Sequence, residues 1–331
     1  MRKKLCFFTV TLMMVAFGMS THVFAAGVKL TIGTSATSQS IIGQTMQHFA
    51  DKVKELSGGE ITVATYPDSQ MGSDTELIEG VQMGTISMVI GTTAPQVSFV
   101  PTLALFDLPN AYSDINTAQK VLGQFNDKME PSFSAAGLHL CTMFPTAFRY
   151  MSSNKAVRGV NDFQGIKIRT MENPYHMAYW KSLGATATPL AFSELYIGLQ
   201  QGTIDAQENP LDIFMSAKFN EQQKYIIDTK HIVFIADILI NKGQWNALSD
   251  AQRNILDQAF QETSAFGTSN AKSIEAKNRQ AIKASGVEII ELDDATIAAM
   301  KKEAAPVYDM IRKAAGAELV DEYLNAINSA Q

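Results

Sequence analysis

The sequence predicts an α/β fold with two similar lobes. Short apolar strand patterns alternate along the chain with helical patterns of ten or more residues, which is typical of βαβ units around a parallel-rich sheet. The segment 76–86 (ELIEGVQMGTI) recurs as 194–204 (ELYIGLQQGTI), with seven of eleven residues identical. A chain of 331 residues also exceeds what one hydrophobic core usually holds. We expect two lobes related by duplication, the alternative being convergence of two similar helix–turn–strand connections.

Composition narrows the class of protein. Charged residues make up 18% of the chain and hydrophobic residues 46%, which argues against a disordered or low-complexity protein. The formal net charge is −6. A nucleic-acid-binding protein needs a basic surface that displaces counterions, so this acidic balance argues against nucleic acid as a partner.

Residues 1–25 are expected to be a cleaved signal peptide. Positive charges at 2–4 precede the apolar run 5–19, and small residues surround position 25. The alternative is a membrane anchor, but the apolar run is shorter than the ~20 residues that span a bilayer. Cleavage would place the protein in the periplasm with a single cysteine, Cys141, and therefore without an intrachain disulfide. Cys141 lies in an apolar run, so we expect a buried small hydrophobe rather than a reactive thiol.

The first half of the mature chain alternates strand and helix patterns. The expected strands are 28–33, 60–66 and 86–90, and the expected helices are 40–56 and 74–83. The second helix stops at Gly84, which suits the left-handed backbone that commonly ends a helix.

The second half repeats this rhythm. Strand-like runs occupy 138–144, 149–153, 166–169, 204–207 and 232–240, with helices in the gaps between them. Gly202 stands in the second copy of the repeat where Gly84 stands in the first, so we expect the same helix ending there.

One helix is predicted to be much longer than the others. Ser249 is its N-cap, with Gln252 as capping-box partner, and helical character continues to about Ala284. About 35 residues at 1.5 Å each span ~50 Å, which is enough to brace both lobes. The alternative is two helices broken near Gly267. A short strand at 287–290 and further helices complete the chain.

Signatures of catalysis are missing from the sequence. It contains no G-x-S-x-G, H-E-x-x-H, G-x-G-x-x-G, Walker or C-x-x-C motif. Ser152 to Lys155 fits S-x-x-K, but at a strand end rather than on a helix. The histidines of the mature chain lack ligand-like spacing and are interpreted as helix-face or core residues: His48, His139, His176 and His231. We therefore expect no enzymatic activity, no cofactor and no metal.

Arginines and amides stand at predicted strand ends instead. Arg169 closes the strand 166–169, and a guanidinium there can form a bidentate pair with a carboxylate. Arg149 opens another strand, and Asn209 closes the strand that follows the second repeat copy. The repeat offset of 118 residues relates Asn209 to Gly91, so Gly91 and Thr92 form the opposing strand end. The alternative for each arginine is a surface salt bridge.

Several ordered motifs resemble one known family. They are 162–174 (DFQGIKIRTMENP), 189–194 (PLAFSE), 199–202 (LQQG), 204–210 (IDAQENP) and 66–73 (YPDSQMGS). They resemble the periplasmic solute-binding proteins of TRAP transporters, DctP type, along essentially the whole mature chain. The resemblance implies a two-lobed, periplasmic-binding-protein-like α/β fold, with a central ligand cleft and a long helix spanning both lobes. Lobe I would comprise 26–148 plus about 237–265, and lobe II 149–236 plus about 266–331.

The resemblance also implies roles for individual residues. Arg169 would pair with the ligand carboxylate, Arg149 would assist directly or through water, and Asn209 would hydrogen-bond the same carboxylate. Phe192 would pack on the ligand. In this family the first-lobe positions, here 35–40, Tyr66 and 91–93, vary with the substrate.

Asp237 is a further candidate because it lies in an apolar strand, where a charge is uncommon without a partner. It could meet a ligand hydroxyl or ammonium group, or pair with another group of the protein. The sequence leaves this choice open.

The expected function is capture of a small organic acid and its delivery to the membrane subunits of a TRAP permease by a monomeric protein. Sugar acids, dicarboxylates, keto acids and amino-acid-like acids all remain candidates. One alternative is the binding component of an ABC-type importer. Another is a periplasmic enzyme acting on a carboxylate, with Glu172, Glu208 or Asp237 as its base.

Overall fold

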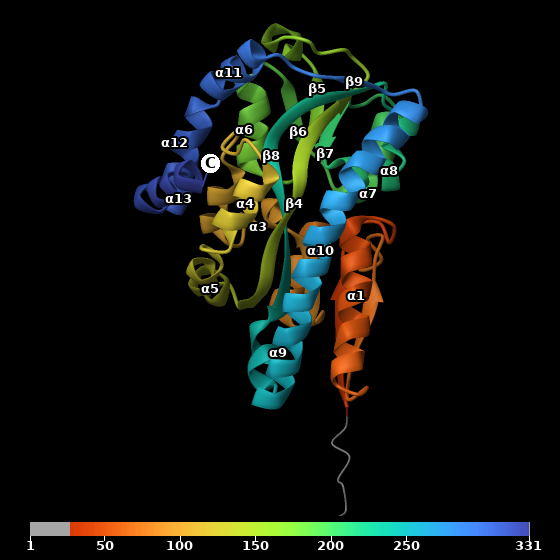
Figure 1. Ribbon diagram of the computed structural model, residues 1–331, viewed down its shortest axis with the longest axis vertical. Coiled ribbons are helices and arrows are strands. Elements are labelled where there is room, and N and C mark those ends of the chain that lie inside the picture. The colour runs from red at the N-terminus through yellow and green to blue at the C-terminus, as the bar shows by residue number, and fades with distance from the viewer. Residues whose placement is uncertain (1–26, 331) are drawn as a thin grey trace, which may run out of the picture.

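A computed structural model describes residues 27–330, so the expected signal peptide lies outside the described residues. The described chain forms one nine-stranded sheet with strand order β2-β1-β3-β8-β4-β7-β5-β6, and β9 pairs with β8. Helices cover this sheet (Figure 1). This order is symmetric: two long strands, β8 and β4, lie at the centre, and the three strands of one β-α-β-α-β unit lie on each side of them.

The first unit follows the predicted pattern closely. Its elements are β1 (Val28–Gly33), α1 (Ile41–Leu56), β2 (Ile61–Tyr66), α2 (Asp74–Met83) and β3 (Met88–Thr92). β1 pairs in parallel with both β2 and β3. β3 starts later than predicted because the backbone N–H groups of Thr85 and Ile86 still donate to the carbonyl oxygen of Gly80, at 3.0 and 3.1 Å. Gly84 has φ of 75°, as its place at the helix end requires.

The second unit has the same arrangement. Its elements are β5 (Lys167–Thr170), α6 (Pro174–Ser182), β6 (Thr186–Pro189), α7 (Phe192–Gln200) and β7 (Ala206–Asn209). β5 pairs in parallel with β6 and β7, as β1 does with β2 and β3. The two repeat copies therefore occupy equivalent places in the two units. The strand β6 was not among the predicted strands.

Two long antiparallel strands join the units. β4 (Leu138–Ser153) and β8 (Tyr225–Asn241) pair along their length and run through the middle of the molecule (Figure 1). The sequence predicted two short strands in place of β4 and a shorter β8. β4 stays continuous because its pairing with β8 shifts register at several points, and one of these shifts, between Pro145 and Ala147, accommodates the proline. β8 pairs with β3 and β4 with β7, both antiparallel.

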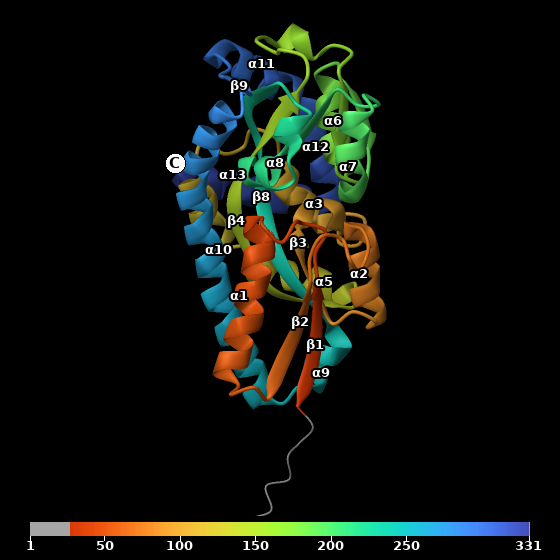
Figure 2. The same cartoon turned by 90° about the vertical axis from the view of Figure 1, so that its right-hand side faces the viewer.

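The long helix α10 (Asp250–Ala284) is continuous over 35 residues, and its capping box between Ser249 and Gln252 is formed. It runs beside α1 at one end and beside α8 (Leu211–Ser216) at the other, so it spans both halves of the molecule (Figures 1 and 2). Gly267 does not break it. A Cβ atom at this position would lie 2.5 Å from the ring of Phe144, so the glycine allows α10 to pack closely on β4.

The remaining elements pack around this frame. They are α3 (Thr93–Gln96), α4 (Ile115–Leu122), α5 (Asn126–Ala135), α9 (Lys242–Ala247), β9 (Glu288–Ile290), α11 (Asp294–Glu303), α12 (Ala305–Ala315) and α13 (Ala317–Ala330), with 3₁₀ turns at Pro101–Asp107, Val160–Phe163 and Phe219–Glu221. The C-terminal α13 is tied back to the body by a hydrogen bond of 2.6 Å between the hydroxyls of Tyr112 and Tyr323. Cys141 is half-buried rather than fully buried, and burial raises the pKa of its thiol well above the usual range.

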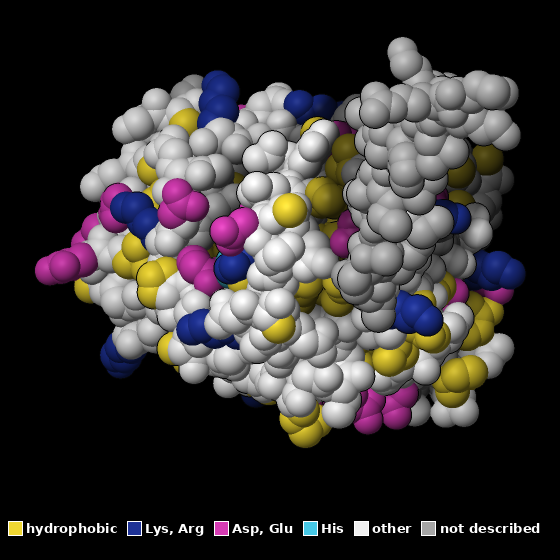
Figure 3. Space-filling view, turned by 90° about the horizontal axis from the view of Figure 1, so that it is seen from below, with side chains coloured by type: hydrophobic (Ala, Val, Ile, Leu, Met, Phe, Trp, Pro, Cys, Tyr) yellow, Lys and Arg dark blue, Asp and Glu magenta, His cyan; other side chains and the backbone are white. Residues whose placement is uncertain are grey.

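The molecular surface seen from below mixes both signs of charge. Where the described residues are visible on this face, acidic and basic side chains are interspersed and hydrophobic side chains form small groups (Figure 3). Between residues 27 and 330, no helix combines the length and the apolar character needed to cross a membrane.

Candidate functional site

A cavity lies where the strand ends of the two units meet. The centre of a water molecule can occupy about 30 Å³ of it, so the cavity is narrow. The first unit and its loops contribute Thr34, Ser35, Ala36, Ile42, Asp74, Gly91 and Thr92, and the second contributes Arg169, Met171, Phe192, Asn209 and Ile213, with Phe234 from β8. The carboxyl ends of parallel strands are where open α/β sheets bind their ligands, so the topology itself favours a site here.

Arg169 is the basic side chain in this lining, and it is only 1% exposed. It stands on β5, and its Nε donates to the carbonyl oxygen of Leu190 at 2.8 Å. Its Nη1 is buried without a hydrogen-bond partner in the described part of the chain. Burial lowers the pKa of Arg169 to about 10, partly opposed by the charge of Glu208, so the guanidinium stays cationic at neutral pH. The cavity thus presents a desolvated cation whose hydrogen bonds are incomplete.

Asn209, Gly91 and Thr92 also line the cavity, as the repeat offset predicts. The side chain of Asn209 is fixed by the protein, since its Nδ2 donates to Gln207 Oε1 at 2.6 Å. A Cβ atom added to Gly91 would meet nothing within 4 Å, so this position leaves room in the cavity.

Phe192, the first residue of α7, lines the cavity beside these polar groups. Its ring packs edge-to-face on Phe219, with 5.9 Å between centroids. Phe192 therefore offers an apolar surface to a bound molecule.

Arg149 lies beneath the cavity rather than in its lining. It is 1% exposed and forms an ion pair with Glu208, with Nη2 at 3.0 Å from Oε1 and Nε bonded to Oε2. Its Nη2 also donates to Asn209 Oδ1 at 3.2 Å. Arg149 therefore contacts both Glu208 and Asn209, while its Nη1 is buried without a hydrogen-bond partner in the described part of the chain.

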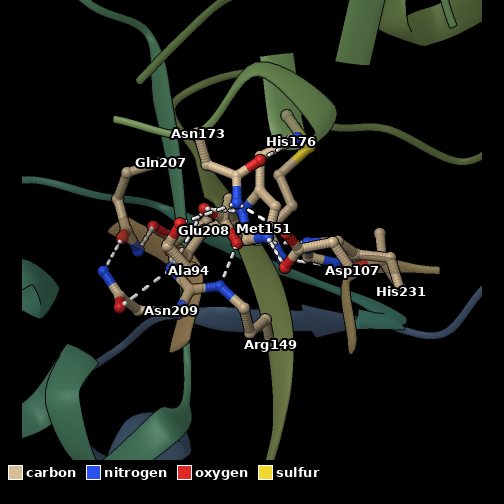
Figure 4. A network of polar contacts seen from close by, with 12 residues as sticks. Ala94, Asp107, Arg149, Met151, Asn173, His176, Gln207, Glu208, Asn209 and His231 are labelled. Atoms are coloured by element: carbon tan, nitrogen blue, oxygen red, sulfur yellow. Dashed lines mark hydrogen bonds and ion pairs between the residues drawn. The ribbon is translucent and has the colours of Figure 1, made fainter. Parts of the chain in front are cut away.

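Glu208 belongs to a buried polar network that links distant parts of the chain (Figure 4). Besides Arg149 it meets His231 Nε2 at 3.2 Å and His176 Nδ1 at 3.5 Å. Burial would raise the pKa of Glu208, but Arg149 and the two histidines hold it well below the usual range. Glu208 is therefore a paired carboxylate, which makes it a poor general base.

The other end of this network reaches the first half of the chain. His176 Nε2 lies 3.0 Å from Asp107 Oδ1, and Asn173 Nδ2 donates to Asp107 Oδ2 at 2.6 Å and to the carbonyl oxygen of Ala94 at 2.8 Å. Burial alone would lower the pKa of His176, but Asp107 and Glu208 raise it to about 9. Both His176 and His231 are buried, in agreement with their interpretation as core histidines.

Asp237 also lies outside the cavity lining. It stands on β8 opposite Gly91, and its Oδ1 accepts a hydrogen bond of 2.8 Å from Gln96 Nε2. Its Oδ2 is buried without a partner among residues 27–330, and burial raises its pKa to about 7. Of the two alternatives left by the sequence, the structure shows a contact with a protein group.

Asp74 also lines the cavity, although it was not among the predicted site residues. Its Oδ1 accepts a hydrogen bond of 2.6 Å from Ser35 Oγ. Burial raises the pKa of Asp74, although the Ser35 bond and the charge of Arg169 oppose this shift. Asp74 directly follows the N-cap Ser73, where the helix dipole favours an acidic residue. That explanation sufficed for the sequence, so nothing in it indicated that Asp74 also lines a cavity.

Comparison with known proteins decides the family. The family model of the bacterial extracellular solute-binding proteins, family 7 (DctP), matches residues 32–314. The chain belongs to this family. A solute-binding protein of Verminephrobacter eiseniae (strain EF01-2) is 32% identical over 305 residues, which cover 91% of this chain and 90% of that protein.

Solved structures of other binding proteins share the fold. The galactonate complex of a sugar acid binding protein from Advenella mimigardefordensis has a TM-score of 0.89 and 27% identity, covering 92% of this chain and 99% of that one. A TRAP periplasmic solute-binding protein from Polaromonas, bound to D-erythronate, has a TM-score of 0.86 and 31% identity, covering 90% and 98%. The resemblance to DctP-type TRAP solute-binding proteins and the two-lobed α/β fold are thereby confirmed.

Proposed function

We propose that this protein binds a small organic acid by pairing its carboxylate with Arg169. The observation that carries the proposal is the buried guanidinium of Arg169, which lines the cavity with Nη1 unbonded among residues 27–330. A buried cation is costly unless it is paired, and a ligand carboxylate supplies the missing partner with matching planar geometry. Similar proteins solved with galactonate and D-erythronate bound support this class of ligand.

The network beneath the cavity prepares the site. Glu208 neutralises Arg149, and Arg149 together with Gln207 orients the amide of Asn209. Because these side chains are already ordered, a ligand loses less free energy in fixing them. We assign Asn209 a hydrogen bond to the ligand, Phe192 an apolar contact, and Arg149 the support of Asn209.

Ligand capture is proposed to involve closure of two lobes, lobe I being 26–148 plus about 237–265 and lobe II 149–236 plus about 266–331. Several hydrogen bonds join these lobes, among them those of Asn173 and His176 to Ala94 and Asp107. Two more lie beside residues that line the cavity. The N–H of Ile41 donates to Asp212 Oδ2 at 3.0 Å, and Thr75 Oγ1 donates to Glu172 Oε2 at 2.7 Å. A ligand that touches both lobes binds the closed state better and so shifts the population toward it.

The closed, loaded protein would deliver its acid to the membrane subunits of a TRAP permease. In this proposal it acts in the periplasm as a monomer, after removal of residues 1–25. The family 7 match favours a TRAP permease over an ABC-type importer as the partner.

Binding without catalysis is the function that the site supports best. The three candidate bases are all engaged or placed elsewhere: Glu208 is paired with Arg149, Glu172 accepts a hydrogen bond from Thr75, and Asp237 lies outside the lining. Mass spectrometry of a bound acid after prolonged incubation checks this reading, because a binding protein returns the acid unaltered.

Replacement of Arg169 tests the proposed function. Arg169→Ala should lower affinity for the bound acid by roughly 10- to 150-fold, the equivalent of one charge-assisted hydrogen-bonded pair. Arg169→Lys should retain part of the affinity, because an ammonium supplies the charge without the planar fork. The measurement is ligand-induced thermal stabilisation across a library of organic acids, followed by titration calorimetry of those that bind.

Arg158→Ala is the matched control, because Arg158 is exposed and pairs only with Glu288 among the described residues. This variant should bind as the wild type does. Folding of Arg169→Ala is expected to be intact, since the only side-chain hydrogen bond that it loses within residues 27–330 is that to Leu190. Undiminished stabilisation by the same acids in Arg169→Ala would remove Arg169 from the site.

A further inference from the structure

The cavity carries opposite charges on its two sides. Asp74 comes from the first turn of α2 in the first unit, and Arg169 from the end of β5 in the second. Both residues line the cavity and so border a common space, and the charge of each affects the pKa of the other. They do not form an ion pair with each other: Asp74 accepts from Ser35 at 2.6 Å, and Arg169 donates to Leu190 at 2.8 Å.

We propose that Asp74 makes this protein selective for acids that carry a hydrogen-bond donor at the end remote from the carboxylate, and that it rejects dicarboxylates. This inference rests on the proposed function, because it takes Arg169 to hold the carboxylate. A molecule anchored there and long enough to cross the cavity places its other end beside Asp74. An ionised Asp74 accepts hydrogen bonds and donates none.

The rest of the lining provides no counter-charge for a second carboxylate. Among the described residues that line the cavity, Arg169 is the only basic one, so a second carboxylate would find no cation beside Asp74. Like charges close together in a desolvated site repel, and one of the two groups must then take up a proton. Dicarboxylates are therefore penalised at the first-unit end of the cavity.

A donor meets the opposite situation. Thr34, Ser35 and Thr92 also line the cavity, and hydroxyl groups can accept or donate hydrogen bonds as the ligand requires. A ligand hydroxyl or ammonium would complete the hydrogen bonding of a carboxylate whose burial already raises its pKa. Both groups share the chemistry that the site recognises, and a matched series of ligands distinguishes them.

The test uses four-carbon acids that differ at one end only: butyrate, 4-hydroxybutyrate, 4-aminobutyrate and succinate, with D-erythronate as a more hydroxylated member. Titration calorimetry gives the affinity of each for the mature protein. We expect the best donor-bearing acid to bind at least about tenfold more tightly than succinate and than butyrate. The hydroxy and amino members then show whether the natural donor is neutral or cationic.

Asp74→Asn carries the decisive comparison. Asparagine has nearly the same shape, and its amide oxygen can still accept the hydrogen bond from Ser35. We expect the preference over succinate to shrink to about threefold or less in this variant, mainly through tighter succinate binding. Glu79→Gln is the matched control, because it removes one negative charge from an exposed position of the same helix. It should leave the preference unchanged.

The outcomes separate this inference from the function on which it rests. Wild-type protein that binds succinate as tightly as the donor-bearing acids would overturn it, as would an unchanged preference in Asp74→Asn. In either case loss of binding in Arg169→Ala would leave the proposed function standing. If no acid of the series bound to the wild-type protein, the inference would fall, while the proposed function would still be decided by the thermal screen of the larger organic-acid library.

Discussion

Buried charges in this protein fall into two groups, and the difference is informative. Arg149 and Glu208 form a buried ion pair outside the cavity lining, although Arg149 Nη1 has no hydrogen-bond partner among residues 27–330. Arg169 and Asp74 lack such a pairing, although both have pKa values shifted by burial. Incomplete pairing of desolvated charges within one cavity is expected at a functional site rather than in a structural core. Individual side chains therefore separate the binding surface from the scaffold that supports it.

Asp237 gives a pH-dependent prediction at the same scale. Burial, partly opposed by the hydrogen bond from Gln96, raises the pKa of Asp237 from 3.8 to about 7. Between these values the folded protein holds a proton that the unfolded chain has lost, so stability falls as pH rises toward 7 and is constant above it. Asp237→Asn should remove this loss, gaining about 1.4 kcal/mol per pH unit over that interval relative to wild type.

Urea denaturation at pH 5, 6 and 8 measures this gain. Asp127→Asn, an exposed aspartate on α5, is the control and should follow the wild-type pH dependence. A gain in Asp237→Asn that is equal at all three pH values would show that Asp237 is ionised throughout.

The site could be predicted from the sequence only where local pattern fixes a residue's place. Alternation along 166–169 predicts the position of Arg169, and the repeat offset predicts that Asn209 and Gly91 meet at one cavity. The partnership of Arg149 with Glu208 joins residues 59 apart in sequence, and no local pattern encodes it. Asp74 was missed because a helix N-terminus already accounts for an acidic residue.

Elements with strong terminal signals were predicted almost to the residue. The capping boxes of α2 and α10 and the glycine ends of the repeat helices are local chemistry that the sequence displays directly. The four-residue β6 ends in a proline and offers too little periodicity to detect. Two strands were predicted in place of β4, because a proline such as Pro145 disfavours a central strand. In the fold the strand continues past Pro145, and its pairing with β8 shifts register there.

Gly267 provides the prediction at the scale of elements. Alanine is about 1 kcal/mol better than glycine in a helix, so propensity alone would favour Gly267→Ala. The added methyl group would lie 2.5 Å from the ring of Phe144 and 3.2 Å from Thr45 Oγ1, which forces α10 away from β4 and α1. We expect a net loss of roughly 1–2 kcal/mol, since overpacking outweighs propensity.

The free energy of unfolding, from urea denaturation, measures this loss. Ser269→Ala, two residues further along the same helix and exposed, is the control and should be neutral or slightly stabilising. Increased stability in Gly267→Ala would mean that α10 and β4 are not in tight contact at this point.

At the scale of the whole molecule, the cavity lies between parts that several kinds of connection hold together. Two strands and the long helix cross from one half to the other, while the wall contacts at Asp212 and Glu172 are single hydrogen bonds. Continuous backbone resists separation of the halves, but it can bend where its pairing is irregular, as between Pro145 and Ala147.

Ligand binding should therefore make the molecule more compact. Small-angle scattering of the free protein should give a larger radius of gyration than that of protein saturated with an acid identified by the thermal screen. The change should be absent in Arg169→Ala at the same acid concentration. Identical scattering curves for free and saturated wild-type protein would contradict closure.

The strand order has a consequence for any attempt to divide the protein. β4 follows the first unit in sequence but borders β7 of the second, and β8 follows the second unit but borders β3 of the first. The long strand that follows each unit in sequence thus pairs with the other unit. A fragment cut between the repeats would have an exposed sheet edge and one strand without its pairing partner. Unpaired strand edges promote aggregation. Two complementary fragments, by contrast, should reassemble, because each supplies the strand that the other needs for pairing.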